Sequence, residues 1–398
     1  MQLMIPSFIR RLAVLAMSIQ LLWTRFVSSF PQFALSRASA PPTLTAFNPI
    51  YTQRQHPSSF KSLTKRASST TVTPSVQSSL YSDEDVVQLS YSEFQPTSSK
   101  GTSHPPVILL HGLLGNKRNF ASLASSLSTQ LQNPRSIYTV DLRNHGENTH
   151  DWKNTMSYSE MARDVLAFID NISSEKAVIV GHSMGGKVAQ SLALMAPERV
   201  AGLVVLDISP VRYYSDKGVG GVGDDSGWKV VEKIVRSVAQ IDLEKGGYKT
   251  KREVDAVLRD GILEDPALRA FVLTNLEQLR AKDVKDSEPM LKWKINWNGI
   301  VNELDRIAGF DVHDQSMDKN LDAVVEEQEL TTSPQYSYDG DVFFIHGGAS
   351  RFVRSSHLPT ITSYFPNHML TTIRGVGHWV HAEAPDDTIA LLKRYLDR

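Results

Sequence analysis

The sequence predicts an α/β protein with a mostly parallel sheet of about eight strands flanked by helices. Short apolar runs alternate with helical patterns from Val107 to Asp207, which is typical of βαβ units in a parallel sheet. A strand gives way to a helix at one sharp turn, residues 181–185. The alternation lapses over about residues 209–340, which predicts a helical lid inserted there, after the sixth strand.

The individual elements follow from the spacing of apolar residues. Wholly apolar runs predict strands buried on both faces, and alternating runs predict strands with one exposed face. Ser157 and Glu160 form a capping box, which predicts the start of a helix. Strands are expected at residues 86–94, 107–111, 136–141, 178–180, 203–207, 342–346 and 369–373. Helices are expected at residues 120–131, 157–172, 187–195, 228–239, 251–258, 266–279 and 385–396.

Residues 1–82 have the composition of a targeting presequence and the rest, 83–398, that of a folded domain. The first segment is rich in Ser and Thr, contains no acidic residue and holds eight Lys or Arg residues, as organellar transit peptides do. We expect it to be largely disordered and to direct the protein to a mitochondrion or a plastid. A tail with no sorting role is the alternative. The apolar run Leu12–Trp23 is too short to span a bilayer, so no membrane span is expected in the mature protein.

Charge and cysteine content exclude several functions. Residues 83–398 hold 34 of the 42 basic residues and all 43 acidic ones, a formal charge of −9. This domain is therefore a poor candidate for binding nucleic acid. The chain contains no cysteine, which rules out disulfides, a thiol nucleophile and thiolate metal sites.

Ser183 is the candidate nucleophile. It lies at the centre of Gly181-His182-Ser183-Met184-Gly185, between an apolar strand and a helix. In such a turn the serine backbone is strained, and the small residues on either side let strand and helix approach closely. A chance match to this short pattern is the alternative, but the strand-to-helix context favours a nucleophile.

A serine hydroxyl needs an adjacent general base, and that base needs an orienting group. His378 follows the last predicted strand and precedes the final helix, so we expect it to be the base; a structural histidine beside Trp379 is the alternative. Asp207 ends the strand next to the nucleophile strand, so its carboxylate is expected to reach the imidazole. Asp305 is the alternative acid.

Acyl transfer also needs two amide donors for the oxyanion. The sequence offers the backbone N–H groups of Met184, directly after the nucleophile, and of Leu113 in His111-Gly112-Leu113. No metal site or cofactor is expected, since His378 and His381 form only a weak pair with no carboxylate cluster to complete it.

Several motifs together resemble one known family. They are His111 to Gly115, Asp141 to Gly146, Gly181 to Lys187, Asp207 to Val211, Leu273 to Leu276 and Gly377 to Trp379. The set is similar to the α/β-hydrolase serine esterases of the bacterial YbfF type and their mitochondrial relative, α/β hydrolase domain-containing protein eleven. The resemblance implies an α/β-hydrolase fold and a serine hydrolase acting on short to medium acyl esters or thioesters. It maps the acid onto Asp207; the acid that some relatives are assigned within the insertion would fall on Asn298.

The predicted lid is expected to line an acyl pocket with apolar side chains and to gate access to it. The candidate substrate-binding residues are Tyr213, Tyr214, Leu276, Trp293 and Trp297. For each of them the alternative is a structural role in the core of the lid.

The expected function is hydrolysis of a small-molecule ester or thioester through an acyl-enzyme intermediate. Two alternatives stay open: a lyase or C–C hydrolase that uses the same triad, and a non-catalytic scaffold that binds a partner. The intact Ser183, His378 and oxyanion residues argue against the scaffold. The sequence identifies no protein partner.

Overall fold

The computed structural model describes residues 85–96, 104–213, 227–279, 291–310 and 336–398. The predicted presequence, residues 1–82, lies outside the described residues, as does Tyr214. Among the described residues, no helix combines the length and the apolar character needed to cross a membrane.

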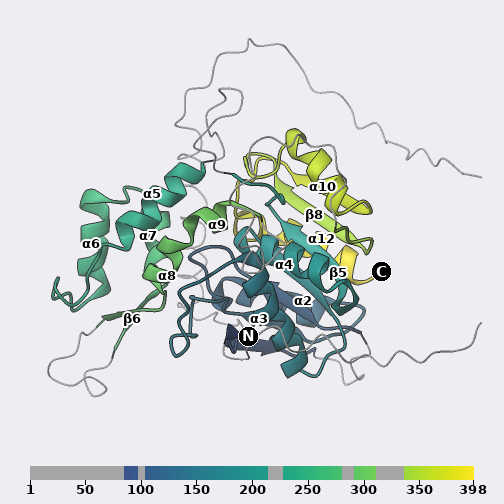
Figure 1. Cartoon of the computed structure of the whole chain (residues 1–398), viewed down its shortest axis with the longest axis horizontal. Coiled ribbons are helices and arrows are strands. Elements are labelled where there is room, and N and C mark those ends of the chain that lie inside the picture. The colour runs from purple at the N-terminus through teal and green to yellow at the C-terminus, as the bar shows by residue number, and fades with distance from the viewer. Residues whose placement is uncertain (1–84, 97–103, 214–226, 280–290, 311–335) are drawn as a thin grey trace, which may run out of the picture.

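A seven-stranded sheet in the order β1-β3-β2-β4-β5-β8-β9 forms the centre of the described domain (Figure 1). Only β1 runs antiparallel to its neighbour; the other pairs are parallel. The prediction of a mostly parallel sheet is confirmed, with one strand fewer than the eight expected. The strands are β1 (Tyr91–Phe94), β2 (Val107–Leu110), β3 (Ile137–Val140), β4 (Ala177–His182), β5 (Val200–Leu206), β8 (Val342–Gly347) and β9 (His368–Ile373).

The first strand is shorter than predicted, since residues 86–90 lie outside β1. The amide of Val87 donates to the carboxylate of Asp164 at 2.9 Å, and that of Ser90 donates to the Asn148 side chain at 2.8 Å. These bonds satisfy the backbone in place of a strand partner.

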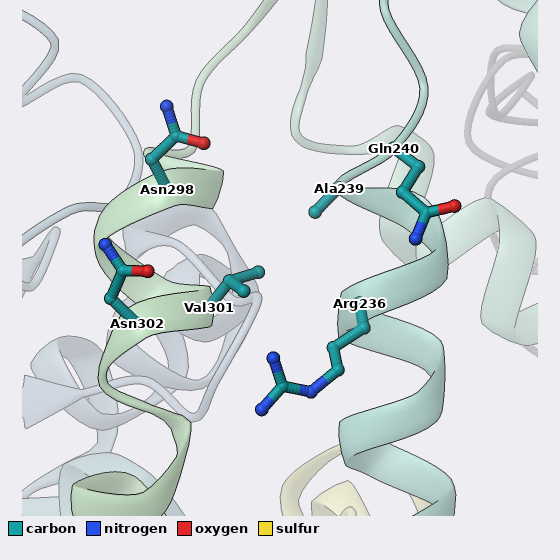
Figure 2. A pocket seen from close by; sticks show the side chains of 6 residues that line it. All are labelled: Arg236, Ala239, Gln240, Asn298, Val301 and Asn302. Atoms are coloured by element: carbon teal, nitrogen blue, oxygen red, sulfur yellow. The ribbon is translucent and has the colours of Figure 1, made fainter.

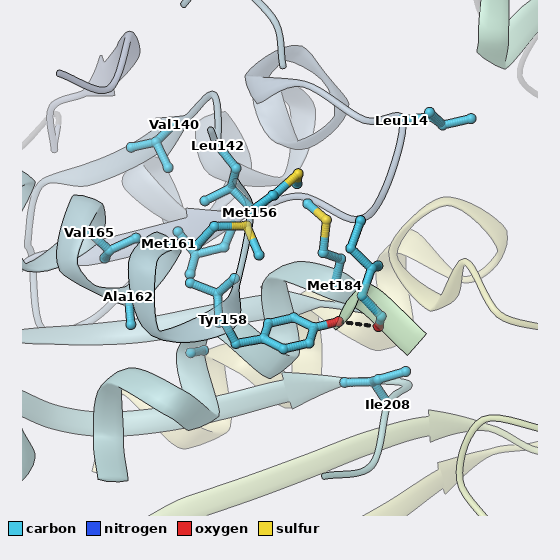
Figure 3. Close-up of a cluster of buried hydrophobic side chains, with 14 of the residues drawn as sticks. Leu114, Val140, Leu142, Met156, Tyr158, Met161, Ala162, Val165, Met184 and Ile208 are labelled. Atoms are coloured by element: carbon cyan, nitrogen blue, oxygen red, sulfur yellow. Dashed lines mark hydrogen bonds between the residues drawn. The ribbon is translucent and has the colours of Figure 1, made fainter. Parts of the chain in front are cut away.

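Alternate residues of the central strands face two different cores. Ile108 and Leu110 of β2 face the core that contains α3 and α4, whereas Val107 and Leu109 face the core that contains α2 and α12. This two-residue period explains why a wholly apolar run is needed in a strand covered on both sides. Figure 3 shows part of the first core.

Four of the helices that cover the sheet, α2, α3, α4 and α12, match predicted ones closely, whereas α10 and α11 were not predicted. The capping box of Ser157 and Glu160 is present at the start of α3, as predicted. The helices are α2 (Ala121–Gln130), α3 (Tyr158–Asn171), α4 (Met184–Met195), α10 (Leu358–Tyr364), α11 (Val380–Glu383) and α12 (Pro385–Leu396), with short 3-10 helices at Lys117–Phe120, Pro197–Arg199 and Ser355–His357.

The insertion follows β5, the fifth strand of the described sheet rather than the sixth. Its elements, which lie to the left of the sheet in Figure 1, are α5 (Trp228–Val238), α6 (Lys251–Gly261), α7 (Pro266–Leu273), β6 (Leu276–Gln278), β7 (Leu291–Trp293), α8 (Trp297–Asn302) and α9 (Leu304–Ala308).

The prediction of an all-helical insertion is wrong in one respect, because β6 and β7 form a small antiparallel pair. The predicted helix over 266–279 ends at Leu273. Beyond it, the carbonyl oxygen of Asn275 accepts a hydrogen bond from the amide of Lys294 at 2.7 Å. Leu276 pairs with Trp293 in the register of the hairpin.

The start of the insertion and the end of α9 meet beside α4. The amide of Tyr213 donates to the carbonyl of Ala308 at 3.0 Å. The ammonium group of the buried Lys187 donates to the carbonyls of Val211 at 2.9 Å and Ala308 at 3.1 Å, and also to that of Gly309. Lys187 lies one helical turn after Ser183, so the base of the insertion is attached to the helix that follows the candidate nucleophile.

Candidate active site

Ser183 occupies a sharp turn between β4 and α4, with φ 52° and ψ −120°. A Cβ at Gly181 would lie 2.1 Å from the carbonyl oxygen of Gly185, and one at Gly185 would lie 2.5 Å from that of His111. Both positions therefore need glycine for strand and helix to approach. A serine held at positive φ by such packing is typical of a nucleophile elbow.

The structure brings Ser183, His378 and Asp207 together in one hydrogen-bonded chain. The Nε2 atom of His378 lies 3.0 Å from the Ser183 hydroxyl oxygen, and its Nδ1 atom lies 2.6 Å from Oδ2 of Asp207. Because a carboxylate only accepts, Nδ1 carries the proton and Nε2 is free to accept one from Ser183. This is the arrangement a general base requires.

The carboxylate of Asp207 is fully buried and is held by the loop that follows β8. The amide of Gly347 donates to Oδ1 at 3.0 Å, and the hydroxyl of Ser350 donates to Oδ2. The loop contains no carboxylate of its own, and the sequence pattern indicates no role for Ser350. The loop supplies two donors for an acid that comes from the neighbouring strand.

The other positions considered for the acid, Asp305 and Asn298, make no hydrogen bond to the imidazole among the described residues. Asp305 is exposed on α9. Asn298 is exposed on α8, where it lines a cavity of about 310 Å³ together with Arg236 of α5 and Gln240, two residues beyond the end of α5 (Figure 2). Asp207 is thus the acid that the geometry supports.

Two further side chains hold His378 in place. The ring of Phe352 lies against the imidazole with centroids 4.2 Å apart and planes at 34°. The Nε2–H group of His182 donates to the carbonyl of His378 at 2.9 Å. Burial holds the pKa of His182 well below its usual value, so His182 is neutral and does not compete for the proton of Ser183.

The two predicted oxyanion donors lie beside the nucleophile. Met184 directly follows Ser183, and a Cβ at Gly112, the residue before Leu113, would lie 3.2 Å from Cβ of Ser183. Among the hydrogen bonds of the described residues, none uses the amide of Leu113 or of Met184. Both amides are thus available to a substrate oxygen.

One histidine buried in the core, His145, supports the Leu113 loop. The Nε2 atom of His145 accepts from the amide of Leu114 at 3.2 Å, and its Nδ1–H group donates to the carbonyl of Arg143 at 2.8 Å. Burial lowers the pKa of His145 to about 3, so this histidine stays neutral. In the sequence, His145 lies within the motif Asp141 to Gly146, and no separate signal indicates its role.

The predicted substrate-binding residues lie in different places. Tyr213 is buried, and its hydroxyl donates to the carbonyl of Phe352 at 2.5 Å. Leu276 is buried in β6. Trp293 and Trp297 pack at right angles with centroids 5.3 Å apart. These tryptophans line a cavity of about 530 Å³ that contains no member of the Ser183 chain.

The fold and the site define a class of protein, the α/β-hydrolases that carry a serine nucleophile. The alpha/beta hydrolase fold family matches residues 105–229. Among curated proteins, the chain is 32% identical to the sn-1-specific diacylglycerol lipase ABHD11 of Danio rerio, over 78% of this chain and 83% of that protein. The chain belongs to the α/β-hydrolase fold family, among its carboxylic ester hydrolases.

Two further comparisons agree with this assignment. The chain is 29% identical to the esterase YbfF of Escherichia coli strain K12, over 76% of this chain and 96% of that protein. A solved structure described as a marine microorganism esterase superposes with a TM-score of 0.61 at 28% identity, covering 78% of this chain and all of that one. The resemblance predicted from the motifs is thereby confirmed.

Proposed function

We propose that the protein hydrolyses carboxylic esters or thioesters of short to medium acyl chains, with Ser183 as nucleophile, His378 as general base and Asp207 as orienting acid. The observation that carries this proposal is the chain of contacts at 3.0 Å and 2.6 Å from Ser183 through His378 to Asp207. The amides of Leu113 and Met184, beside Ser183, complete a site for a tetrahedral intermediate.

The chemistry proceeds in two halves. The Ser183 oxygen bonds to the acyl carbon while its proton passes to Nε2 of His378, and the carbonyl oxygen becomes an oxyanion facing the Leu113 and Met184 amides. His378 then returns the proton to the leaving alcohol or thiol as the bond to it breaks, which leaves an acyl-enzyme. Water repeats the sequence in the second half and releases the acid.

The substrate is a small acyl ester or thioester. This proposal is supported by relatives named diacylglycerol lipase and esterase. The inserted segment acts as a lid in this proposal, and Tyr213, Leu276, Trp293 and Trp297 stay candidates for lining the acyl pocket.

Labelling with a fluorophosphonate probe tests the nucleophile. We expect covalent labelling of the wild type, none of Ser183→Ala, and full labelling of Ser128→Ala, which removes a buried serine of α2. In Asp207→Asn we expect ester turnover to fall by roughly 10⁴, the loss that follows when the triad acid no longer fixes the imidazole tautomer. Folded wild type that resists the probe would contradict the proposal.

A screen of p-nitrophenyl esters and acyl thioesters graded by chain length would define the substrate. A peak at short to medium chains is expected. A wild type that takes the probe but cleaves none of these substrates would favour the lyase or C–C hydrolase alternative, which the names of the relatives do not favour.

For residues 1–82 we propose a role as an organellar presequence, supported by the absence of acidic residues and the eight basic ones. A fusion of this segment to a fluorescent protein should accumulate in a mitochondrion or plastid. A diffuse signal would contradict the proposal.

A further inference from the structure

Asn275 connects the insertion to the loop that carries a candidate oxyanion donor. Its side chain is fully buried at the turn between α7 and β6. The Nδ2–H group donates to the carbonyl of Leu114 at 2.8 Å. Leu114 lies in the core domain, 161 residues earlier in the chain, so this bond joins the two parts of the protein at the site.

Leu114 is in a conformation that leucine rarely adopts. The amide of Gly115 donates to the carbonyl of Gly112 at 2.9 Å, which closes a β-turn around Leu113 and Leu114. Leu114 has φ 60°, in the left-handed region that favours glycine at the third turn position. The turn that presents the Leu113 amide is therefore strained and needs support.

Side chains from two other segments supply that support. His145 accepts from the amide of Leu114 at 3.2 Å, and Asn275 donates to its carbonyl at 2.8 Å. Both polar backbone groups of the strained residue are thus fixed from outside the turn. His145 comes from the loop after β3, whereas Asn275 comes from the insertion.

The polar character of Asn275 fits a role as donor. Its Oδ1 atom is buried and has no hydrogen-bond partner among the described residues. A buried acceptor without a partner is unfavourable, and a leucine of similar size would avoid that cost. The bond from Nδ2 to Leu114 is the interaction that an apolar side chain could not replace.

We propose that Asn275 is a positioning residue for the oxyanion hole, through which the insertion fixes the direction of the Leu113 amide. This inference rests on the proposed function of the same site. The same hydrogen bond then docks the insertion onto the core and aligns the Leu113 amide with the substrate oxygen. The alternative is that Asn275 only attaches the insertion to the core.

The experiment compares Asn275→Leu with Tyr158→Phe as a matched control. Tyr158→Phe also removes one hydrogen bond between core and insertion, from the Tyr158 hydroxyl to the carbonyl of Ile307 at 2.5 Å (Figure 3), but it does not touch Leu114. Asn275→Ser is made in parallel in case the leucine variant does not fold. The readouts are kcat and KM for p-nitrophenyl butyrate and the inhibition constant of an alkyl trifluoromethyl ketone, which forms a tetrahedral adduct with serine.

We expect Asn275→Leu to lower kcat about tenfold with little change in KM, less than the hundredfold or more that follows loss of a whole oxyanion donor. Affinity for the trifluoromethyl ketone should fall in the same proportion as kcat/KM, because both report stabilisation of the tetrahedral state. Asn275→Ser should change both readouts in the same direction, and Tyr158→Phe should leave them within twofold of wild type.

A change in KM alone, an unchanged affinity for the ketone, or an equal loss in Tyr158→Phe would overturn the proposal. End-point labelling by fluorophosphonate separates this failure from failure of the proposed function. If Asn275 acts only in attachment, the variants are still labelled at Ser183. If Ser183 is not the nucleophile, the wild type is not labelled either.

Discussion

The hydroxyl of Ser350 donates a hydrogen bond to the same carboxylate oxygen of Asp207 that accepts from Nδ1 of His378. The acid is therefore oriented from two sides, by the imidazole and by the loop after β8. Gly347 of that loop holds the other oxygen. A carboxylate fixed in this way holds its Oδ2 atom in one position, from which it accepts a hydrogen bond from the Nδ1–H group of His378.

We expect Ser350→Ala to lower kcat for ester hydrolysis about tenfold, since Asp207 loses one of its charge-assisted hydrogen bonds and with it part of its orientation. Ser350→Thr keeps the hydroxyl and should recover most of the rate. Steady-state kinetics on a p-nitrophenyl ester checks both. Equal rates in wild type and Ser350→Ala would show that Gly347 alone is sufficient.

Gly181→Ala should destabilise the protein by at least about 3 kcal/mol, because the new methyl group would overlap the backbone of Gly185 at the elbow, and the contacting atom cannot move as a side chain could. Gly261→Ala is the control: it ends α6, and a Cβ there meets no atom within 4 Å. Urea unfolding should show that Gly261→Ala is neutral or slightly stabilising. Similar losses in both variants would contradict the steric argument.

Replacing Lys187 by Met should cost about 2 to 6 kcal/mol of unfolding free energy. The substitution leaves carbonyls of Val211 and Gly309 without this donor, and buried acceptors without partners cost about 1 to 3 kcal/mol each. Lys245→Met, at a lysine with an 89% exposed side chain, should change stability by less than about 0.5 kcal/mol. Denaturant midpoints measured on both variants test this, and equal midpoints for Lys187→Met and Lys245→Met would contradict the prediction.

Stability should fall as the pH drops below about 6.5, the usual pKa of histidine. In the folded state burial lowers the pKa of His145 to about 3 and the pKa values of His111 and His182 below the usual value. Between pH 6.5 and 3 the unfolded chain therefore binds more protons than the folded one, which favours unfolding. Above pH 6.5 this contribution is complete and constant.

For His145 alone, the unfolding free energy should be lower at pH 5 than at pH 7.5 by about 2 kcal/mol, since each pH unit below 6.5 costs ~1.4 kcal/mol. Urea titrations at the two pH values provide the measurement. An unfolding free energy that stays level between them would mean that these histidines accept protons in the folded protein.

The sequence was sufficient to predict Ser183, His378 and Asp207 as partners, because each lies at or just after the carboxyl end of a predicted strand. Parallel strands bring those ends to one edge of the sheet, so local patterns carry the long-range information. The structure bears out the contacts among the three. Their catalytic roles stay predictions until the variants are measured.

Ser350 and Asn275 could not be assigned in the same way. The contact of Ser350 with Asp207 spans 143 positions, and that of Asn275 with Leu114 spans 161. One feature of the sequence bears on Ser350. The loop after β8 contains no carboxylate, so its polar groups are free to donate hydrogen bonds to the acid on the neighbouring strand. Asn275 was hidden because its surroundings have the apolar spacing of a helix, whereas α7 ends at Leu273.

The bond from Tyr213 to Ala308 closes the part of the insertion that contains α5 to α9, and this closure has a consequence for engineering the protein. When the two ends of a segment are held together, the segment can become longer at little cost, because the entropic cost of closing a loop rises only with the logarithm of its length. Segments grafted between Tyr213 and Ala308 would leave the strands that carry Ser183 and Asp207 where they are. Because Asn275 lies within the grafted stretch and donates to Leu114, a graft would have to keep this residue to preserve the support of the Leu113 turn.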